Sequence, residues 1–381
     1  MSRMERAAKG LLAGYTQFLV LLPLQFALAP VILKTAGKET LGAFQAVMQL
    51  VGYLGLVELG LPETVARFAA REYRDGQLTD AYLGTLRIGR FISLGANSVM
   101  AGGLFVLSYY VGELLGLESS RRGEARLAVQ LYAGWMLLRA LLSPYQGGLI
   151  ASQQLAFTNI AGLLGNIVRL VAVMGLTAMG FGLAGMMMAL VLAEALVALA
   201  SWYRFAWLYP GQHLGWKTRE RALVGDMLRY TAGAVLVALA WRLIYQTDNL
   251  VVGTLFGASA VGVYYATQMP ATMGIALVNV LANSTMPGIY QMHGQSETVS
   301  MRKTLVRLLR LTIAMGLGMA VGLIILNRAF VSLWVGPGMY AGTAMTVALG
   351  VFLLFNTTHR AVMVFLLADG KVGFLGKVHF V

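Results

Sequence analysis

The 381-residue sequence contains no cysteine, and its other candidate metal ligands are few. Without cysteine, disulfide bonds, thiol nucleophiles and cysteine-ligated metals are excluded. The four histidines lie far apart and lack the spacing of a metal site: His213, His293, His359 and His379. We therefore expect neither a metal nor another cofactor.

Charge is also scarce, because only 12% of the residues are charged whereas 58% are hydrophobic. The mean hydropathy is +0.71, while a soluble domain carries about 25% charged residues. Such a surface has to face lipid, and it leaves no room for a soluble catalytic domain. We therefore expect a membrane protein that is not an enzyme.

The formal net charge of +13 would suggest a nucleic-acid partner if the protein were soluble. The basic residues, however, lie mainly in short loops between apolar runs, where they set the orientation of membrane helices. No nucleic-acid partner is therefore expected.

Apolar runs long enough to cross a bilayer, which takes about 20 residues, recur along the whole chain. The sequence predicts ten such spans: 11–33, 40–61, 84–112, 126–150, 157–178, 181–207, 228–256, 260–286, 304–330 and 341–368. The predicted fold class is therefore all-α and polytopic. The loop after the second span is expected to include an interfacial helix, with Val65, Phe68 and Ala69 on its apolar stripe.

Basic residues are distributed unequally between the two sides of the membrane. The N-terminus, the C-terminal tail and the loops after the second, sixth and eighth spans contain 19 Lys and Arg residues, counted with the loop flanks. The opposite side contains 6. Loops rich in Lys and Arg remain in the cytoplasm. The imbalance therefore predicts a cytoplasmic N-terminus.

An internal repeat emerges when the chain is shifted by 220 residues. The shift superposes residues at corresponding loops and helix ends: Gly37 and Gly257, Gly42 and Gly262, Phe44 and Tyr264, Ala46 and Ala266, Arg87 and Arg307, Arg90 and Arg310, and Gly116 and Gly336. The repeat predicts two six-helix bundles of the same orientation. The bundles are expected at 1–207 and 227–381, joined by a cytoplasmic linker at 208–226. Because residue 381 corresponds to residue 161, the second bundle is expected to lack counterparts of two helices.

Several charged residues fall inside the predicted spans. They are Arg139, Arg169, Arg242 and Arg360, with the acidic residues Glu58, Glu194 and Asp248. An arginine at mid-bilayer costs from about 3 to more than about 10 kcal/mol, so it needs a carboxylate partner or a water-filled cavity. Pairing with Glu194 or Asp248 explains a single arginine as well as a cavity does. It explains the set less well, because four bases outnumber three acids.

Polar residues gather on one face in the first, second, seventh and eighth spans. The seventh span has the broadest face, at three- and four-residue steps: Trp241, Arg242, Tyr245, Gln246, Asp248 and Asn249. The other members are Gln17, Gln25, Gln45, Gln49, Gln268, Thr272, Asn279 and Asn283. Polar residues can simply join helices, but four such faces favour a central hydrated cavity.

The residue types in this cavity predict what it holds. An excess of guanidinium groups suits phosphate or carboxylate. Asp248, Glu194 and Glu58 are candidates for proton or sodium coupling, because buried acids can titrate near neutral pH. Neutralisation of nearby arginines explains these acids equally well.

Three parts of the sequence resemble polysaccharide-biosynthesis flippases of the multidrug/oligosaccharidyl-lipid/polysaccharide (MOP) superfamily. They are Leu41–Ala46 with Glu58–Pro62, Thr247–Gly253 continuing through Gly257 to Ala260–Ala266, and Phe330–Gly336 with Tyr340 and Ala341. The superfamily includes the O-antigen and lipid II flippases and the drug/cation antiporters. The resemblance extends over nearly the whole chain.

The resemblance implies two bundles that move by alternating access, with the first, second, seventh and eighth helices around the cavity. It implies an undecaprenyl-diphosphate-linked oligosaccharide as substrate, moved to the outer leaflet of a bacterial cytoplasmic membrane, with polysaccharide polymerase machinery as a partner. Arg242 best matches the basic cavity residues of the family. The other matched positions are Arg139, Arg169 and Arg360, with Gln246 and Asn249 beside Arg242.

Two other functions stay open. A drug/cation antiporter of the same superfamily would depend on Asp248 rather than on the arginines. A membrane-embedded glycan ligase or polymerase would need a sizeable extracytoplasmic loop with acid, base or metal ligands, which the short loops do not offer.

Overall fold

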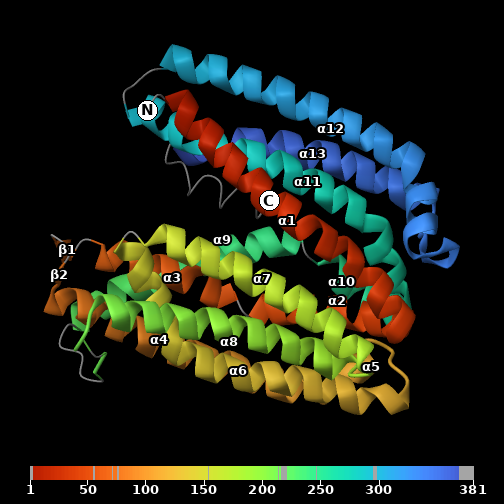
Figure 1. Ribbon diagram of the computed structural model, residues 1–381, viewed down its shortest axis with the longest axis horizontal. Helices are drawn as coiled ribbons and strands as arrows, with labels where there is room; N and C mark the ends of the chain where they lie inside the picture. Colours follow the sequence, from red (N-terminus) through yellow and green to blue (C-terminus); the bar gives the residue numbers. More distant parts are fainter. Residues whose placement is uncertain are drawn as a thin grey trace. The chain divides into compact units, whose positions relative to one another are not determined.

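The computed structural model describes residues 3–368, except 55, 71, 75–76, 153, 213, 216–220, 246 and 295–297. This part is almost entirely helical (Figure 1). The helices are α1 (Arg3–Thr35), α2 (Gly37–Leu54), α3 (Leu56–Ala69), α4 (Asp80–Leu107), α5 (Val111–Leu114), α6 (Ser119–Ala151), α7 (Leu155–Ala178), α8 (Leu183–Leu208), α9 (Arg221–Tyr245), α10 (Asp248–Phe256), α11 (Ala258–Gly294), α12 (Thr298–Val335) and α13 (Thr343–Ala368). A two-residue hairpin, β1 (Tyr73–Arg74) and β2 (Gln77–Leu78), and a 3-10 turn, Pro337–Met339, complete the described elements.

The predicted all-α membrane class is confirmed. Each of the ten predicted spans coincides with a helix or with two consecutive helices. Within the described residues, α4, α7, α8, α12 and α13 are long and apolar enough to cross a membrane by length and composition.

The seventh predicted span is not a single helix, because it is divided into α9 and α10. In the seventh span, the backbone N–H groups of Leu250 and Val251 both donate to the carbonyl of Thr247 at 3.1 Å, so α10 starts a new helix there. Hydropathy continues across this interruption, which is why an apolar-run criterion does not find it.

The prediction of an interfacial helix after the second span is wrong. Val65 and Ala69 are fully buried in α3, which packs against α4, α6 and α9. Gly147 of α6 permits this packing, because a Cβ atom there would lie 2.8 Å from Cβ of Val65. The apolar stripe therefore faces protein rather than the membrane surface.

The chain forms two compact units. Unit 1 contains Met1–Pro30 and Gly262–Val381, and unit 2 contains Val31–Val261. The units are defined by contacts between residues, so their bounds differ from those of the two predicted halves of the sequence. The predicted division at 1–207, 208–226 and 227–381 stays a prediction.

Unit 2 has a core of buried side chains from α3, α4, α6, α8 and α9. Its largest polar member, Tyr82, donates its hydroxyl to the carbonyl of Gly148 at 2.6 Å. Arg90 is also buried and donates to the carbonyl of Leu214 at 2.9 Å. This bond fixes part of the predicted linker to the core.

Unit 1 has two buried clusters within α11, α12 and α13. One contains Ala282, Ile289, Leu308, Ala361, Val364 and Phe365, and the other contains Ala271, Ala320, Leu323, Leu349 and Leu353.

The backbone supports the predicted repeat. Gly37 and Gly257, which the repeat aligns, both have φ of 82°. The aligned Gly116 and Gly336 have φ of 60° and 99°. Only glycine adopts these conformations at little cost. The helices therefore turn at corresponding positions in both halves.

Candidate functional site

A polar cavity of about 210 Å³ lies among α6, α7 and α8 of unit 2, which run side by side (Figure 1). Its polar lining residues are Arg139, Ser143, Gln146, Asn166, Arg169 and Glu194. The two arginines and the glutamate lie well inside their helices, away from the ends. In a bilayer, this position corresponds to the hydrocarbon region.

Arg139 and Glu194 form an ion pair in this cavity. Nη1 of Arg139 lies 2.9 Å from Oε2 of Glu194, and the side chains are 26% and 29% exposed. Nε1 of Trp135 donates to the same oxygen at 2.8 Å. Trp135 and Arg139 are four residues apart, so α6 presents both donors on one face. The pairing predicted for single arginines therefore applies to Arg139.

Arg169 brings a second guanidinium to the same cavity from α7. Two arginines and one glutamate give the lining a formal charge of +1. Gly165 allows α7 to approach Val197 of α8 closely, whereas a side chain at Gly162 would meet open space. The small residues of α7 therefore bring the helices together and keep the cavity open.

A buried polar chain leads from the cavity to α4. The hydroxyls of Ser143 and Ser93 lie 3.0 Å apart, and Nδ2 of Asn97 donates to the carbonyl of Ser93 at 2.9 Å. All three residues are buried. These residues join α4 to α6, as polar residues between membrane helices commonly do.

The polar faces predicted for the second and seventh spans meet each other. Oε1 of Gln49 in α2 accepts from the N–H of Leu250 in α10 at 2.9 Å. The hydroxyl of Tyr53 donates to the carbonyl of Arg242 at 3.2 Å and also contacts the hydroxyl of Thr247. These bonds fasten the interruption between α9 and α10 to α2.

The guanidinium of Arg242 occupies space that Gly52 leaves free. A Cβ atom at position 52 would lie 2.8 Å from Cζ of Arg242 and closer still to Nη1. Arg242 is absent from the described lining of the cavity among α6, α7 and α8. It therefore belongs to a separate part of unit 2.

Two further predicted site residues begin α10. Asp248 lies in the first turn, where the helix dipole favours a negative charge. Asn249 is only 6% exposed, and its buried Oδ1 has no hydrogen-bond partner within the described residues. Such an acceptor can receive a bond from a ligand or water.

Arg360 lies half-buried in α13 of unit 1, whereas the other three predicted arginines belong to unit 2. The structure therefore brings Arg139 and Arg169 together with Glu194. A chamber shared by all four arginines stays a prediction. Gln246 and the side chains of Glu58, Gln17, Trp241, Tyr245 and Asn283 lie outside the described residues.

Unit 1 contains a larger and almost wholly apolar cavity, which the sequence did not single out. It measures about 390 Å³ and lies among α1, α11, α12 and α13. Asn327 is the one polar side chain in its described lining, and its Nδ2 donates to the carbonyl of Thr267 at 3.0 Å. An asparagine within an apolar span is the sequence signal for this site.

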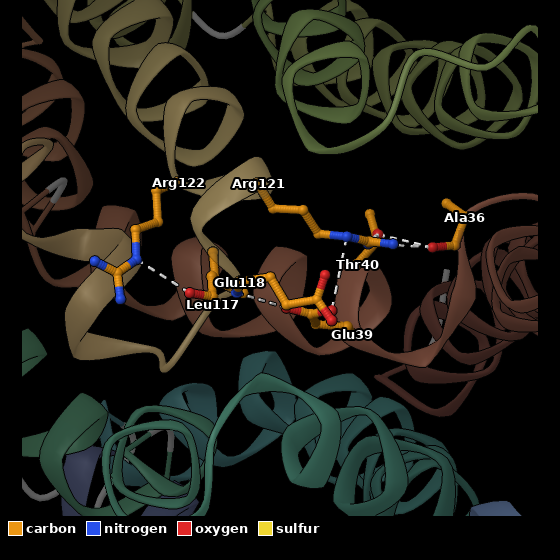
Figure 2. A network of polar contacts seen from close by, with 7 residues as sticks. All are labelled: Ala36, Glu39, Thr40, Leu117, Glu118, Arg121 and Arg122. Atoms are coloured by element: carbon orange, nitrogen blue, oxygen red, sulfur yellow. Dashed lines mark hydrogen bonds and ion pairs between the residues drawn. The ribbon is translucent and has the colours of Figure 1, made fainter.

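A second missed feature is a polar network between the ends of α2 and α6 (Figure 2). Arg121 of α6 lies 3.6 Å from the carboxylate of Glu39, donates to the carbonyl of Ala36 at 3.5 Å and contacts the hydroxyl of Thr40. Glu39 also accepts from the backbone N–H of Glu118 at 3.3 Å. From the sequence, Arg121 was counted only as a basic residue of a loop. In the structure it connects the start of α6 to the start of α2.

Comparison with known proteins identifies the family of this chain. The family described as "Polysaccharide biosynthesis protein" matches residues 11–293. A curated relative, the uncharacterized membrane protein EpsK of Bacillus subtilis (strain 168), is 23% identical over 333 residues. The match includes 85% of this chain and 64% of EpsK, so the chain spans slightly less than two thirds of that relative.

Solved structures share the fold. A multidrug resistance MATE family transporter of the MOP superfamily, in its inward-facing conformation, superposes with a TM-score of 0.66 at 14% identity, with coverage of 92% of this chain and 95% of that one. A MOP superfamily transporter from Pyrococcus furiosus Vc1 (DSM3638), whose binding pocket has reverse polarity suggesting a different function, gives 0.59 at 13% identity and covers 96% of both chains. At these identities the likeness shows the fold alone. The match over residues 11–293 confirms the predicted polysaccharide-biosynthesis family.

Proposed function

Because the chain belongs to the polysaccharide biosynthesis protein family, we propose that it flips a lipid-linked oligosaccharide across the cytoplasmic membrane. The substrate is an undecaprenyl-diphosphate-linked sugar unit that moves from the cytoplasmic to the outer leaflet. Its diphosphate is anionic and has to cross a hydrocarbon layer that strongly disfavours charge. The protein must therefore offer a positive site inside the bilayer, exposed to each side in turn.

The polar cavity of unit 2 is the observation that carries this proposal. Arg139 and Arg169 line it with Glu194, and the formal charge of the lining is +1. Guanidinium groups bind phosphate oxygens through paired hydrogen bonds. In this proposal Arg169 binds the diphosphate, while the bond to Glu194 fixes the orientation of Arg139.

The size of the cavity limits which part of the substrate it holds. Its volume of about 210 Å³ is below the roughly 300–1,000 Å³ of pockets that enclose a whole drug-sized ligand. The cavity therefore suits the diphosphate rather than the whole sugar unit. Arg242, beside Gly52, is the second proposed contact, with Gln246 and Asn249 close to it in sequence.

A drug/cation antiporter is the competing function, and the MATE-like fold is compatible with it. That function would place the essential chemistry on Asp248, which begins α10, with Glu194 and Glu58 as further coupling candidates. In the flippase, by contrast, these acids would balance arginines or couple transport to protons or sodium. The flippase therefore requires the arginines, whereas the antiporter requires the acidic residues.

The decisive experiment measures flipping of a lipid-linked oligosaccharide in proteoliposomes. Arg169→Gln should slow flipping roughly 10- to 100-fold, because a charge-assisted hydrogen bond contributes about 1.5–3 kcal/mol. Arg328→Gln is the matched control, since Arg328 is exposed near the end of α12. Drug transport that survives Arg169→Gln but is lost in Asp248→Asn, without flipping of the lipid-linked oligosaccharide by the wild type, would favour the antiporter.

The proposal includes the topology and the partners. The N-terminus and the linker at 208–226 lie in the cytoplasm, the halves at 1–207 and 227–381 have the same orientation, and polysaccharide polymerase machinery receives the product. Reporter fusions after residues 215 and 338 should report opposite sides of the membrane. Equal reporter activity at both positions would reject this topology.

A further inference from the structure

The charged side chains of the polar cavity in unit 2 lie at one level of the bundle. Helices α6, α7 and α8 are joined by short turns and alternate in direction, so α6 ends, α7 begins and α8 ends at the same end of the bundle. At about 1.5 Å per residue, Arg139 lies about 18 Å from that end, and Arg169 and Glu194 lie about 21 Å from it. The bond of 2.9 Å between Arg139 and Glu194 agrees with these levels. The three residues therefore form a charged layer.

The neutral polar side chains of the cavity lie between the charged layer and that end of the bundle. Asn166 lies about 17 Å from the end, Ser143 about 12 Å and Gln146 about 8 Å. Beyond the charged layer in the other direction, the described lining contains only Leu190 and Ala193. The cavity therefore continues from the charges into a neutral polar layer on one side only.

Two side-chain amides of the neutral layer have unused hydrogen-bonding groups. The hydroxyl of Ser143 is already bonded to that of Ser93. Asn166 and Gln146, by contrast, are half-buried and have no hydrogen-bond partner within the described residues. Each amide offers two donors and one acceptor, and burying such groups without partners is costly. Water or a ligand therefore has to supply the partners.

We propose that Asn166 and Gln146 bind the first sugar of the lipid-linked substrate and that this sugar is uncharged. The inference rests on the proposed function, which places the diphosphate at Arg169. Asn166 lies one helical turn from Arg169, about 5 Å along α7, so a sugar joined directly to the diphosphate reaches it. Sugar hydroxyl and acetamido groups both donate and accept hydrogen bonds, as the two side-chain amides do.

The charge of the lining explains why the first sugar has to be neutral. Arg139 is bonded to Glu194, and the formal charge of the lining is +1. A diphosphate carries more negative charge than that, and the described lining offers no third base. A carboxylate on the first sugar would therefore enter the membrane without a counter-charge, which is strongly unfavourable.

The experiment compares three synthetic undecaprenyl diphosphates bound to the whole protein in nanodiscs. One carries an N-acetylhexosamine, one carries a hexuronic acid and one carries no sugar, and native mass spectrometry measures the dissociation constant of each. The wild type should bind the N-acetylhexosamine lipid about 10-fold more tightly than the sugar-free lipid, because both amides add hydrogen bonds. It should bind the hexuronic acid lipid less tightly than the N-acetylhexosamine lipid.

Variants on two helices assign the preference to the amides. Asn166→Leu and Gln146→Leu should each reduce it about 3-fold and leave binding of the sugar-free lipid unchanged, and either variant decides if the other does not fold. Arg169→Gln should weaken binding of all three lipids. Asn159→Leu is the matched control, because Asn159 is exposed on the same helix. Gln146→Lys adds the missing base and should tighten binding of the hexuronic acid lipid about 10-fold.

The failure of this inference differs from the failure of the proposed function. If the wild type binds the N-acetylhexosamine lipid and the sugar-free lipid equally well, the inference is overturned and the proposed function stands. A preference that survives both leucine variants, or tighter binding of the hexuronic acid lipid by the wild type, has the same consequence. If none of the three lipids binds, the proposed function is rejected together with the inference.

Discussion

The two units enclose cavities of opposite chemistry. The cavity of unit 2 measures about 210 Å³ and contains Arg139, Arg169 and Glu194. The cavity of unit 1 measures about 390 Å³, and Asn327 is its one described polar side chain. Three of the intramembrane charges therefore share one cavity, whereas the described lining of the unit 1 cavity contains no charged side chain.

Filling each cavity with a larger side chain tests which of the two is needed for flipping, and we expect the largest effect here. Each is lined by a glycine whose added Cβ would meet nothing within 4 Å, Gly162 in unit 2 and Gly322 in unit 1. Gly162→Leu should slow flipping more than about 10-fold, because it blocks the site proposed for the diphosphate. Gly322→Leu should leave flipping within about 3-fold.

The matched pair controls for the effect of adding a leucine to a membrane helix. Both variants should reach the membrane and unfold at temperatures close to the wild type, because neither side chain meets an atom at its Cβ. If Gly322→Leu blocks flipping and Gly162→Leu does not, the substrate headgroup is bound elsewhere.

The ion pair in the polar cavity predicts the next largest effect, on stability. Glu194→Leu would leave Arg139 half-buried beside an apolar side chain. Loss of one partner from a fully buried pair costs about 3–5 kcal/mol. Because these side chains are 26% and 29% exposed, we expect about 2 kcal/mol, measured as a lower thermal unfolding temperature in detergent.

The double variant Arg139→Leu/Glu194→Leu should recover most of this loss, since two apolar side chains can replace an ion pair. A double variant less stable than Glu194→Leu would show that Arg139 stabilises unit 2 through other contacts.

Much of the fold could be predicted from the sequence, because hydropathy reports the solvent that each segment faces. All ten predicted spans coincide with helices. The aligned glycines Gly37 and Gly257 share one backbone conformation, so the repeat could be found from the residues that such turns require.

The errors have a physical cause as well. Hydropathy cannot tell lipid from protein as the neighbour of an apolar face, so Val65 and Ala69 were placed at the membrane surface. It is also insensitive to hydrogen bonding, so the interruption between α9 and α10 was missed.

The candidate site was predictable in its residues but less so in their arrangement. Glu194 was recognised as a partner for an arginine, and the structure selects Arg139. Sequence spacing could not show that Arg169 shares their cavity, because three different helices contribute to it. The contact between Gln49 and Leu250 likewise joins residues 201 positions apart.

The smallest expected effect concerns two glycines of α12 that border different surroundings. At Gly322 an added Cβ meets open cavity, whereas at Gly316 it would touch the hydroxyl of Thr357 and lie 3.4 Å from Cδ1 of Leu354. Alanine stabilises a helix interior by about 0.8–1 kcal/mol relative to glycine. Gly322→Ala should therefore raise the unfolding free energy by up to about 1 kcal/mol, while Gly316→Ala should lower it, because overpacking typically costs about 1–3 kcal/mol. Thermal unfolding of both variants under identical detergent conditions measures the difference. Equal changes in unfolding free energy would mean that α12 is packed equally closely at Gly316 and Gly322. The residues around the unit 1 cavity would then move to contact the added side chain.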